Sequence, residues 1–230
     1  MKLELKKLGL IGTFLFSGLF LSSCLNNDDG PVIPDQSGFM LFVNTSPGTN
    51  GLKYFANGEA VTMPALNYNE LYGYTYQEVG ETNFTIRTGS ADLDTLSLDI
   101  DINRYYSLFA VNTPDNIELV AYQDNPVAIS TPNKASIRFL QLSHNTPLVK
   151  VAIEGMEENL GIYYFKQASS FMEVDNIFNK YIYLINAETN DTILSKPLIL
   201  EAGKTYSVFS EGIYGSDNDD LDLDVQLITL

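Results

Sequence analysis

The sequence predicts an all-β protein with two tandem antiparallel β-sandwich domains. Apolar residues alternate with polar ones over many short segments, as at residues 96–102 and 221–227. A period of two places the apolar side chains on one face of a strand. Turn residues such as Asn57-Gly58 and Ala202-Gly203 separate these segments, and no long amphipathic helix appears after residue 24. The chain also repeats itself with a period near 100 residues, the size of a whole small sandwich.

Composition narrows the classes of function. Of the 230 residues, 45% are apolar, enough for packed cores. The chain has 13 basic and 29 acidic residues, a formal charge of −16. This balance argues against a nucleic-acid partner, because phosphate binding needs a surface rich in Lys and Arg. One cysteine excludes internal disulfides and multi-cysteine zinc sites, and one histidine leaves little room for histidine chemistry. We therefore expect no cofactor.

Residues 1–23 have the features of a signal peptide. Three lysines precede an apolar run of 14 residues at 8–21, which suits a signal-peptide core and is short for a membrane span. The run ends in Leu21-Ser22-Ser23-Cys24, which resembles the lipobox of bacterial lipoproteins. The resemblance implies cleavage before Cys24 and lipidation of this cysteine, which would anchor the protein to a membrane. The alternative is an ordinary secretory signal that happens to contain a cysteine.

Residues 24–37 are expected to form a flexible lipidated tether. They are polar, contain proline and carry only acidic charges. Asp28 and Asp29 look like the acidic export signals of Bacteroidota surface lipoproteins. That likeness implies a lipid-anchored outer-membrane protein exposed on the cell surface, and the alternative is one that faces inward. Without residues 1–23, the chain has 10 basic and 28 acidic residues, a net charge of −18.

The internal repeat sets the expected domain boundaries. Phe42 and Phe139 are 97 residues apart, and Asp94-Thr95 and Asp191-Thr192 share that offset. The segment YSLF at 106–109 matches YSVF at 206–209 with an offset of 100. We therefore expect a first sandwich at 38–124, a linker at 125–134 and a second sandwich at 135–230.

Several of the repeated motifs resemble one known family. The second half contains LILEAGKTYSVF at 198–209 and ASIRFLQLSH at 135–144, and the first half contains FVNTSPGT at 42–49 and INRYYSLFAV at 102–111. These segments look like the domain of unknown function 4397, a family of Ig-like β-sandwich modules of secreted bacterial proteins, often in tandem on lipoproteins. The chain departs from the family pattern at His144-Asn145, where the family prefers proline after the serine. It departs again at Asn103-Arg104, which replaces Gly-Lys.

The resemblance implies two Ig-like sandwiches and brings no established activity with it. The residues themselves indicate no catalytic group. Ser143 and His144 are adjacent, so at a strand end they point to opposite faces, and no G-x-S-x-G motif is present. Paired carboxylates could serve glycoside hydrolysis, but most acids alternate with core residues and therefore face solvent.

Three tyrosines are candidate ligand contacts. Tyr72, Tyr74 and Tyr76 are two residues apart, which would place them on one face of a strand with Gly73 and Thr75 opposite. An exposed stripe of this kind could stack on sugar rings or contact a protein. The alternative is that this face belongs to the core.

Two further motifs are candidate sites of modification or metal binding. Thr95 and Thr192 each lie in an Asp-Thr-apolar sequence, which resembles the acceptor for O-linked glycans in Bacteroidota; the alternative is turn chemistry before a strand. The acidic run at 216–224 offers Asp217, Asp219 and Asp220 as calcium ligands, but it lacks the turn glycine and final glutamate of an EF-hand loop. The alternative is a solvated hairpin that leads into an acid-faced last strand.

Together these observations predict a non-enzymatic, lipid-anchored protein of the cell envelope. We expect it to bind or adhere at the cell surface, with a surface glycan or a protein as partner. The alternative is a fimbrial or matrix structural subunit, and a glycan-active enzyme is the third possibility.

Overall fold

The computed structural model describes residues 36–230, which form an all-β fold and confirm the predicted fold class. This part of the chain has sixteen strands, and its helical segments are two short 3-10 helices, η1 (Pro114–Asn116) and η2 (Asp219–Leu221). None of its helices is long and apolar enough to cross a membrane. Residues 1–35 lie outside the described part of the chain. The expected signal peptide at 1–23, the lipidation of Cys24 and most of the expected tether at 24–37 therefore stay predictions.

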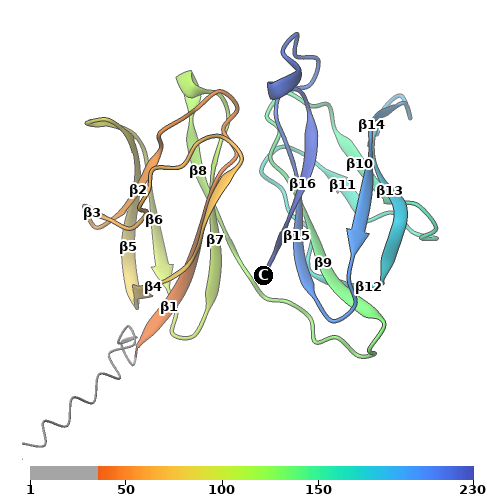
Figure 1. Ribbon diagram of the computed structural model, residues 1–230, viewed down its shortest axis with the longest axis horizontal. Helices are drawn as coiled ribbons and strands as arrows, with labels where there is room; N and C mark the ends of the chain where they lie inside the picture. The colour runs from red at the N-terminus through yellow and green to blue at the C-terminus, as the bar shows by residue number, and fades with distance from the viewer. Residues whose placement is uncertain (1–35) are drawn as a thin grey trace, which may run out of the picture. The chain divides into compact units, whose positions relative to one another are not determined.

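The first eight strands form two four-stranded sheets. They are β1 (Ser37–Asn44), β2 (Lys53–Ala56), β3 (Glu59–Ala60), β4 (Glu70–Glu78), β5 (Gly80–Thr88), β6 (Ala91–Ile100), β7 (Tyr105–Val111) and β8 (Glu118–Gln123). Their orders are β4-β1-β7-β8 and β3-β2-β5-β6 (Figure 1).

The last eight strands repeat this arrangement. They are β9 (Lys134–Gln141), β10 (Val149–Ile153), β11 (Gly161–Tyr163), β12 (Met172–Asp175), β13 (Ile177–Asn186), β14 (Thr192–Leu200), β15 (Thr205–Glu211) and β16 (Asp224–Thr229). The orders β12-β9-β15-β16 and β11-β10-β13-β14 match those of the first half position by position. The sequence repeat is therefore a repeat of the fold.

Each half contains one parallel pair within otherwise antiparallel sheets. β1 runs parallel to β7, and β9 runs parallel to β15. Five strands separate β1 from β7 along the chain, so the connection is long enough for the chain to return in the same direction. The expectation of purely antiparallel sheets is corrected at these two pairs.

Each half also has its own core between its two sheets. In the first, Phe42, Tyr54 and Phe84 are fully buried, and the Phe42 ring centroid lies 5.1 Å from that of Tyr54. The matched tyrosines of the repeat, Tyr106 and Tyr206, are both buried. Each hydroxyl accepts a hydrogen bond of 3.1 Å from the backbone N–H five residues earlier. The local sequence motif thus encodes the same hydrogen-bonded corner twice.

A third apolar cluster, here called the seam, joins the two halves, and all described residues belong to one compact unit. The seam contains buried residues of both halves: Leu41, Val43, Phe109, Val111, Leu140, Leu142, Phe209 and Ile228. The rings of Phe109 and Phe209 are 5.5 Å apart. The seam therefore buries the second face of four strands, β1, β7, β9 and β15. The alternation in the sequence had predicted strands with one face toward solvent.

Candidate functional site

A hollow of about 560 Å³ lies at an open edge of the first sandwich. It is lined by residues 75–78 of β4, by Thr82 of β5, and by residues 56–57 and 59–61 of the β2–β3 hairpin. β3 and β4 are the outermost strands of their sheets, so the hollow lies where neither sheet has a further strand in the described chain. We call it the edge hollow.

The lining of the edge hollow combines one aromatic ring with hydrogen-bonding groups. The Tyr76 side chain is 48% exposed, so its ring is accessible to a ligand. Glu59 and Glu78 are exposed, and neither forms an ion pair within residues 36–230. The Gln77 amide donates 3.0 Å to the Thr75 hydroxyl. A ring beside carboxylate, amide and hydroxyl groups suits a ligand with an apolar face and many hydroxyls.

The expectation that Tyr72, Tyr74 and Tyr76 share one face is wrong. The pairing of β4 with β1 has a register shift between Met40 and Phe42, which adds a residue to β4 and reverses the facing of the following side chains. Tyr72 packs against the core of the first sandwich, whereas Tyr74 packs against the seam and donates a 2.6 Å hydrogen bond to Asp124. Tyr76 is the tyrosine of the three that lines the edge hollow. Contact of any of them with a ligand stays a prediction.

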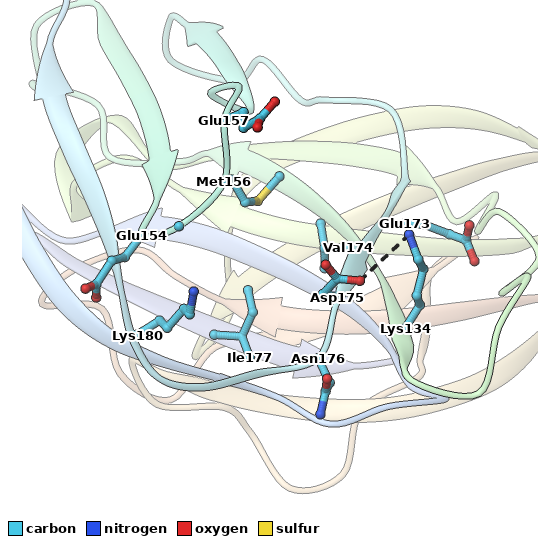
Figure 2. Close-up of a pocket in the computed structure, with 11 residues that line it drawn as sticks. Lys134, Glu154, Met156, Glu157, Glu173, Val174, Asp175, Asn176, Ile177 and Lys180 are labelled. Atoms are coloured by element: carbon cyan, nitrogen blue, oxygen red, sulfur yellow. Dashed lines mark ion pairs between the residues drawn. The ribbon is translucent and has the colours of Figure 1, made fainter.

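The second sandwich has a hollow of about 310 Å³ at the equivalent place (Figure 2). Lining positions 57, 59, 60, 76, 77 and 78 of the edge hollow correspond, at the repeat offset of 97, to lining positions 154, 156, 157, 173, 174 and 175. The counterpart of Tyr76 is Glu173, whose pKa is lowered because it accepts hydrogen bonds from the backbone and hydroxyl of Ser130. The two sandwiches therefore have hollows at equivalent positions, but the residues that line them differ in chemistry.

Two lysines give this second hollow a charged lining. Lys134 lies 3.8 Å from Asp175, the pair joined by the dashed line in Figure 2. Lys180 extends over Gly155, where an added Cβ would lie 2.2 Å from the Lys180 Nζ. With no aromatic ring in its lining, this hollow is less suited than the edge hollow to stack on a sugar.

Thr95 and Thr192 are both exposed on outer strands. Thr95 lies within β6, with its hydroxyl 3.0 Å from that of Thr85, and Thr192 is the first residue of β14. Thr95 thus lies inside a strand and not in a turn before one. O-glycosylation of either residue stays a prediction.

The calcium candidates are not gathered into a site. Asp219 and Asp220 lie in η2, and Asp217 lies in the loop before it. Within residues 36–230, no group of three or more His, Cys, Asp or Glu side chains is placed to hold a metal ion.

The neighbouring Ser143 and His144 do not bond to each other. The Ser143 hydroxyl donates a hydrogen bond of 2.9 Å to the Gly212 carbonyl. Burial lowers the pKa of His144, and its Nδ1 has no hydrogen-bond partner within the described residues. Ser143 is thus engaged with the backbone and not with its neighbour.

The sequence reasoning missed a buried ion pair at the seam. Asp124 follows β8 and accepts hydrogen bonds from Arg138 of β9 and, at 2.8 Å, from the Ser107 hydroxyl. The side chains of Arg138 and Asp124 are 3% and 2% exposed. The signal for this site was a single charged residue, Arg138, inside the largely apolar segment 137–142, at the position that Leu41 holds in the first repeat.

Three comparisons with known proteins bear on the chain. The family model described as "Domain of unknown function (DUF4397)" matches residues 38–152. No curated protein matches the chain in sequence. Among solved structures, the chain is similar to a candidate polysaccharide-binding protein (DUF1812) from Bacteroides thetaiotaomicron VPI-5482. The identity is 11%, the coverage is 84% of this chain and 95% of that one, and the TM-score is 0.25. At that score, the likeness carries no argument about this chain.

Proposed function

Because the chain belongs to the DUF4397 family, whose description assigns no activity, we propose its function from its own residues: a non-enzymatic module that binds a saccharide at the cell envelope. The protein would be held at the outer membrane by a lipid on Cys24, with the two sandwiches exposed at the cell surface. The lipobox-like sequence before Cys24 and the acidic residues that follow it support this location.

The observation that carries the proposal is the composition of the edge hollow. Tyr76 offers a half-exposed ring, and Glu59, Glu78 and Asn57 line the same hollow with groups that can bind hydroxyls. Sugar rings have apolar C–H faces that pack on aromatic rings and equatorial hydroxyls that bond to carboxylates and amides. The hollow opens between two strand edges, so a chain of sugar units could lie along it without threading through a closed cavity.

The experiment is a saccharide-binding screen with the lipidated protein purified in detergent, followed by titration of the best ligand. Tyr76→Ala is expected to weaken binding by about tenfold, the loss typical of an aromatic contact at the centre of a site. Tyr76→Phe keeps the ring and is expected to bind nearly as the natural protein does. The matched control is Tyr164→Ala, because Tyr164 is 62% exposed and does not line the edge hollow.

Two results would contradict the proposal. One is that no saccharide binds. The other is that Tyr76→Ala and Tyr164→Ala bind a saccharide equally well, which would place the contact elsewhere.

A further inference from the structure

Glu211, the last residue of β15, is a buried carboxyl that forms no ion pair and no close hydrogen bond within residues 36–230. Its side chain is 1% exposed, and in this part of the chain neither carboxylate oxygen has a well-formed hydrogen bond. Burial raises the pKa of Glu211, and the charge of Lys196 and the Gln226 side chain lower it by less. Its counterpart in the first repeat, at the offset of 100, is Val111, a fully buried residue of the seam. The second repeat thus has an acid where the first has an apolar side chain. Burying a poorly paired acid costs free energy. A residue that breaks the local pattern at a cost to stability points to a function.

Glu211 lines a hollow of about 140 Å³, several times the ~30 Å³ that one water molecule occupies in the liquid. Most of the surrounding side chains are apolar, and they come from both halves of the chain: Val43, Leu71, Phe209, Leu227 and Ile228. Leu71 is 47% exposed and Leu227 is 39% exposed, so part of the lining of the hollow lies at the solvent-exposed surface. The hollow therefore combines an apolar wall with one acid and with the polar side chains of Thr45, Asn69 and Gln226.

The charged groups nearest Glu211 are already engaged. Asp224 of β16, the cross-strand neighbour of Glu211, accepts hydrogen bonds of 2.6 and 2.7 Å from Lys196 of β14. The Gln226 amide donates 2.9 Å to the same Asp224 carboxylate. On the side of the first sandwich, the pKa of Tyr68 is raised by burial and by the charges of Glu211 and Asp224. Within the described residues, Lys196 forms an ion pair with Asp224, and Glu211, on which the charge of Lys196 also acts, forms no ion pair of its own.

We propose that this hollow binds an alkylammonium group, with the ammonium on the Glu211 carboxylate and the methylene chain against Leu71 and Leu227. The shared chemistry could be supplied by a free primary amine or by a lysine side chain of another protein. Such a group matches the hollow in both respects, since its stem is apolar and its tip is a cation that donates three hydrogen bonds. This site is independent of the saccharide site at the edge hollow.

Binding has a proton signature. Burial raises the pKa of Glu211 to about 8, so at pH 7 the free carboxyl is mostly protonated. An ammonium ion can pair with it only in the ionised form, so the Glu211 proton leaves to solvent as the ammonium enters. The step balances in charge and atoms. The neutral acid and the ammonium ion become a carboxylate–ammonium pair, and one proton is released to solvent.

The test is calorimetric titration of the lipidated protein at pH 7 in two buffers of different ionisation enthalpy. One arm uses n-butylammonium chloride, and the other uses Nα-acetyl-lysine-N-methylamide, which presents the lysine side chain in a peptide context. We expect binding in at least one arm with release of about one proton per site. Binding of the amine alone would identify a small amine as the occupant, and binding of the lysine compound would favour a protein lysine.

Two variants and one neutral analogue make the result specific. Glu211→Gln is expected to weaken binding by about tenfold or more and to abolish the proton release, because it removes the charge and keeps the shape. Glu188→Gln, at an exposed glutamate of the β13–β14 turn, is the matched control and is expected to change neither quantity. n-Butanol has the same stem without the charge and is expected not to bind. The proposal is overturned if neither ammonium compound binds, if n-butanol binds as well, or if Glu211→Gln binds equally.

Discussion

The buried ion pair at the seam allows a quantitative prediction. Asp124→Ala removes a carboxylate that binds Arg138, the Ser107 hydroxyl at 2.8 Å and the Tyr74 hydroxyl at 2.6 Å. Arg138 would keep its 2.8 Å bond to Ser207 and its 3.0 Å bond to the Gln123 carbonyl, but no acid would balance its charge. Burial already lowers the pKa of Arg138, which shows that its surroundings disfavour the charged form.

The expected loss of stability follows from the burial of both partners. With side chains 3% and 2% exposed, loss of one partner leaves a desolvated charge, which costs about 3–5 kcal/mol in the free energy of unfolding. The pair Arg87–Asp92 provides the matched control, because its side chains are 28% and 59% exposed. Asp92→Ala is expected to cost less than about 1 kcal/mol, since water screens that pair.

The assay is urea unfolding of the purified full chain, with the natural chain and both variants measured side by side. The double variant Asp124→Ala/Arg138→Met removes both charges and is expected to be more stable than Asp124→Ala alone. A cost for Asp124→Ala no larger than that for Asp92→Ala would show that burial of the Asp124–Arg138 pair does not raise its contribution to stability. A double variant that is less stable than the single one would contradict the expected cost of an unpaired buried charge.

Three further substitutions test other parts of the structure, each by urea unfolding. Glu211 has a folded-state pKa of about 8 against an ordinary 4.5, so its burial costs stability increasingly as pH rises from 4.5 to 8, roughly 3 kcal/mol at pH 7. Glu211→Gln should therefore be more stable than the natural chain at pH 7 and nearly equal at pH 4.5; a pH-independent difference would contradict this. Tyr54→Phe removes a hydroxyl that donates 2.6 Å to the Val43 carbonyl and accepts 3.2 Å from the Ala110 N–H, and should cost about 1–3 kcal/mol; a neutral effect would speak against these bonds. Gly212→Ala would place a Cβ 2.1 Å from the Asp222 carbonyl oxygen at a φ of +80°, whereas Gly203→Ala has a φ of +79° and no atom within 4 Å. Gly212→Ala should thus cost several times the ~1 kcal/mol expected for Gly203→Ala, and equal costs would refute the close approach.

The strands and the repeat were predictable because they depend on local patterns. The alternation at 96–102 falls largely in β6, and that at 221–227 continues into β16. The matched Phe42 and Phe139 occupy equivalent places in β1 and β9. These features need only the period of two and self-similarity along the chain. The period of two is read from neighbouring residues, and the repeat is read by aligning one half of the sequence with the other.

The candidate sites were less predictable because they depend on register and on contacts between the two halves. The bulge in β4 separates Tyr72 from Tyr74, and spacing alone cannot reveal an added residue in one strand. The seam buries both faces of β1 and β9. Its signals were continuous apolar runs such as residues 39–43, interrupted in the second half by Arg138. Asp124 and Arg138 are paired in space on opposite sides of the linker, which no local pattern encodes.

Photo-cross-linking on intact cells tests whether the edge hollow contacts a ligand at the cell surface, as proposed above. A photo-reactive amino acid is introduced at position 76 and, as control, at the exposed position 164. Irradiation is expected to yield an adduct with an envelope saccharide from position 76 and much less from position 164. Protease added outside the cells is expected to remove the adduct. Equal yields at both positions, or an adduct protected from external protease, would contradict the proposal.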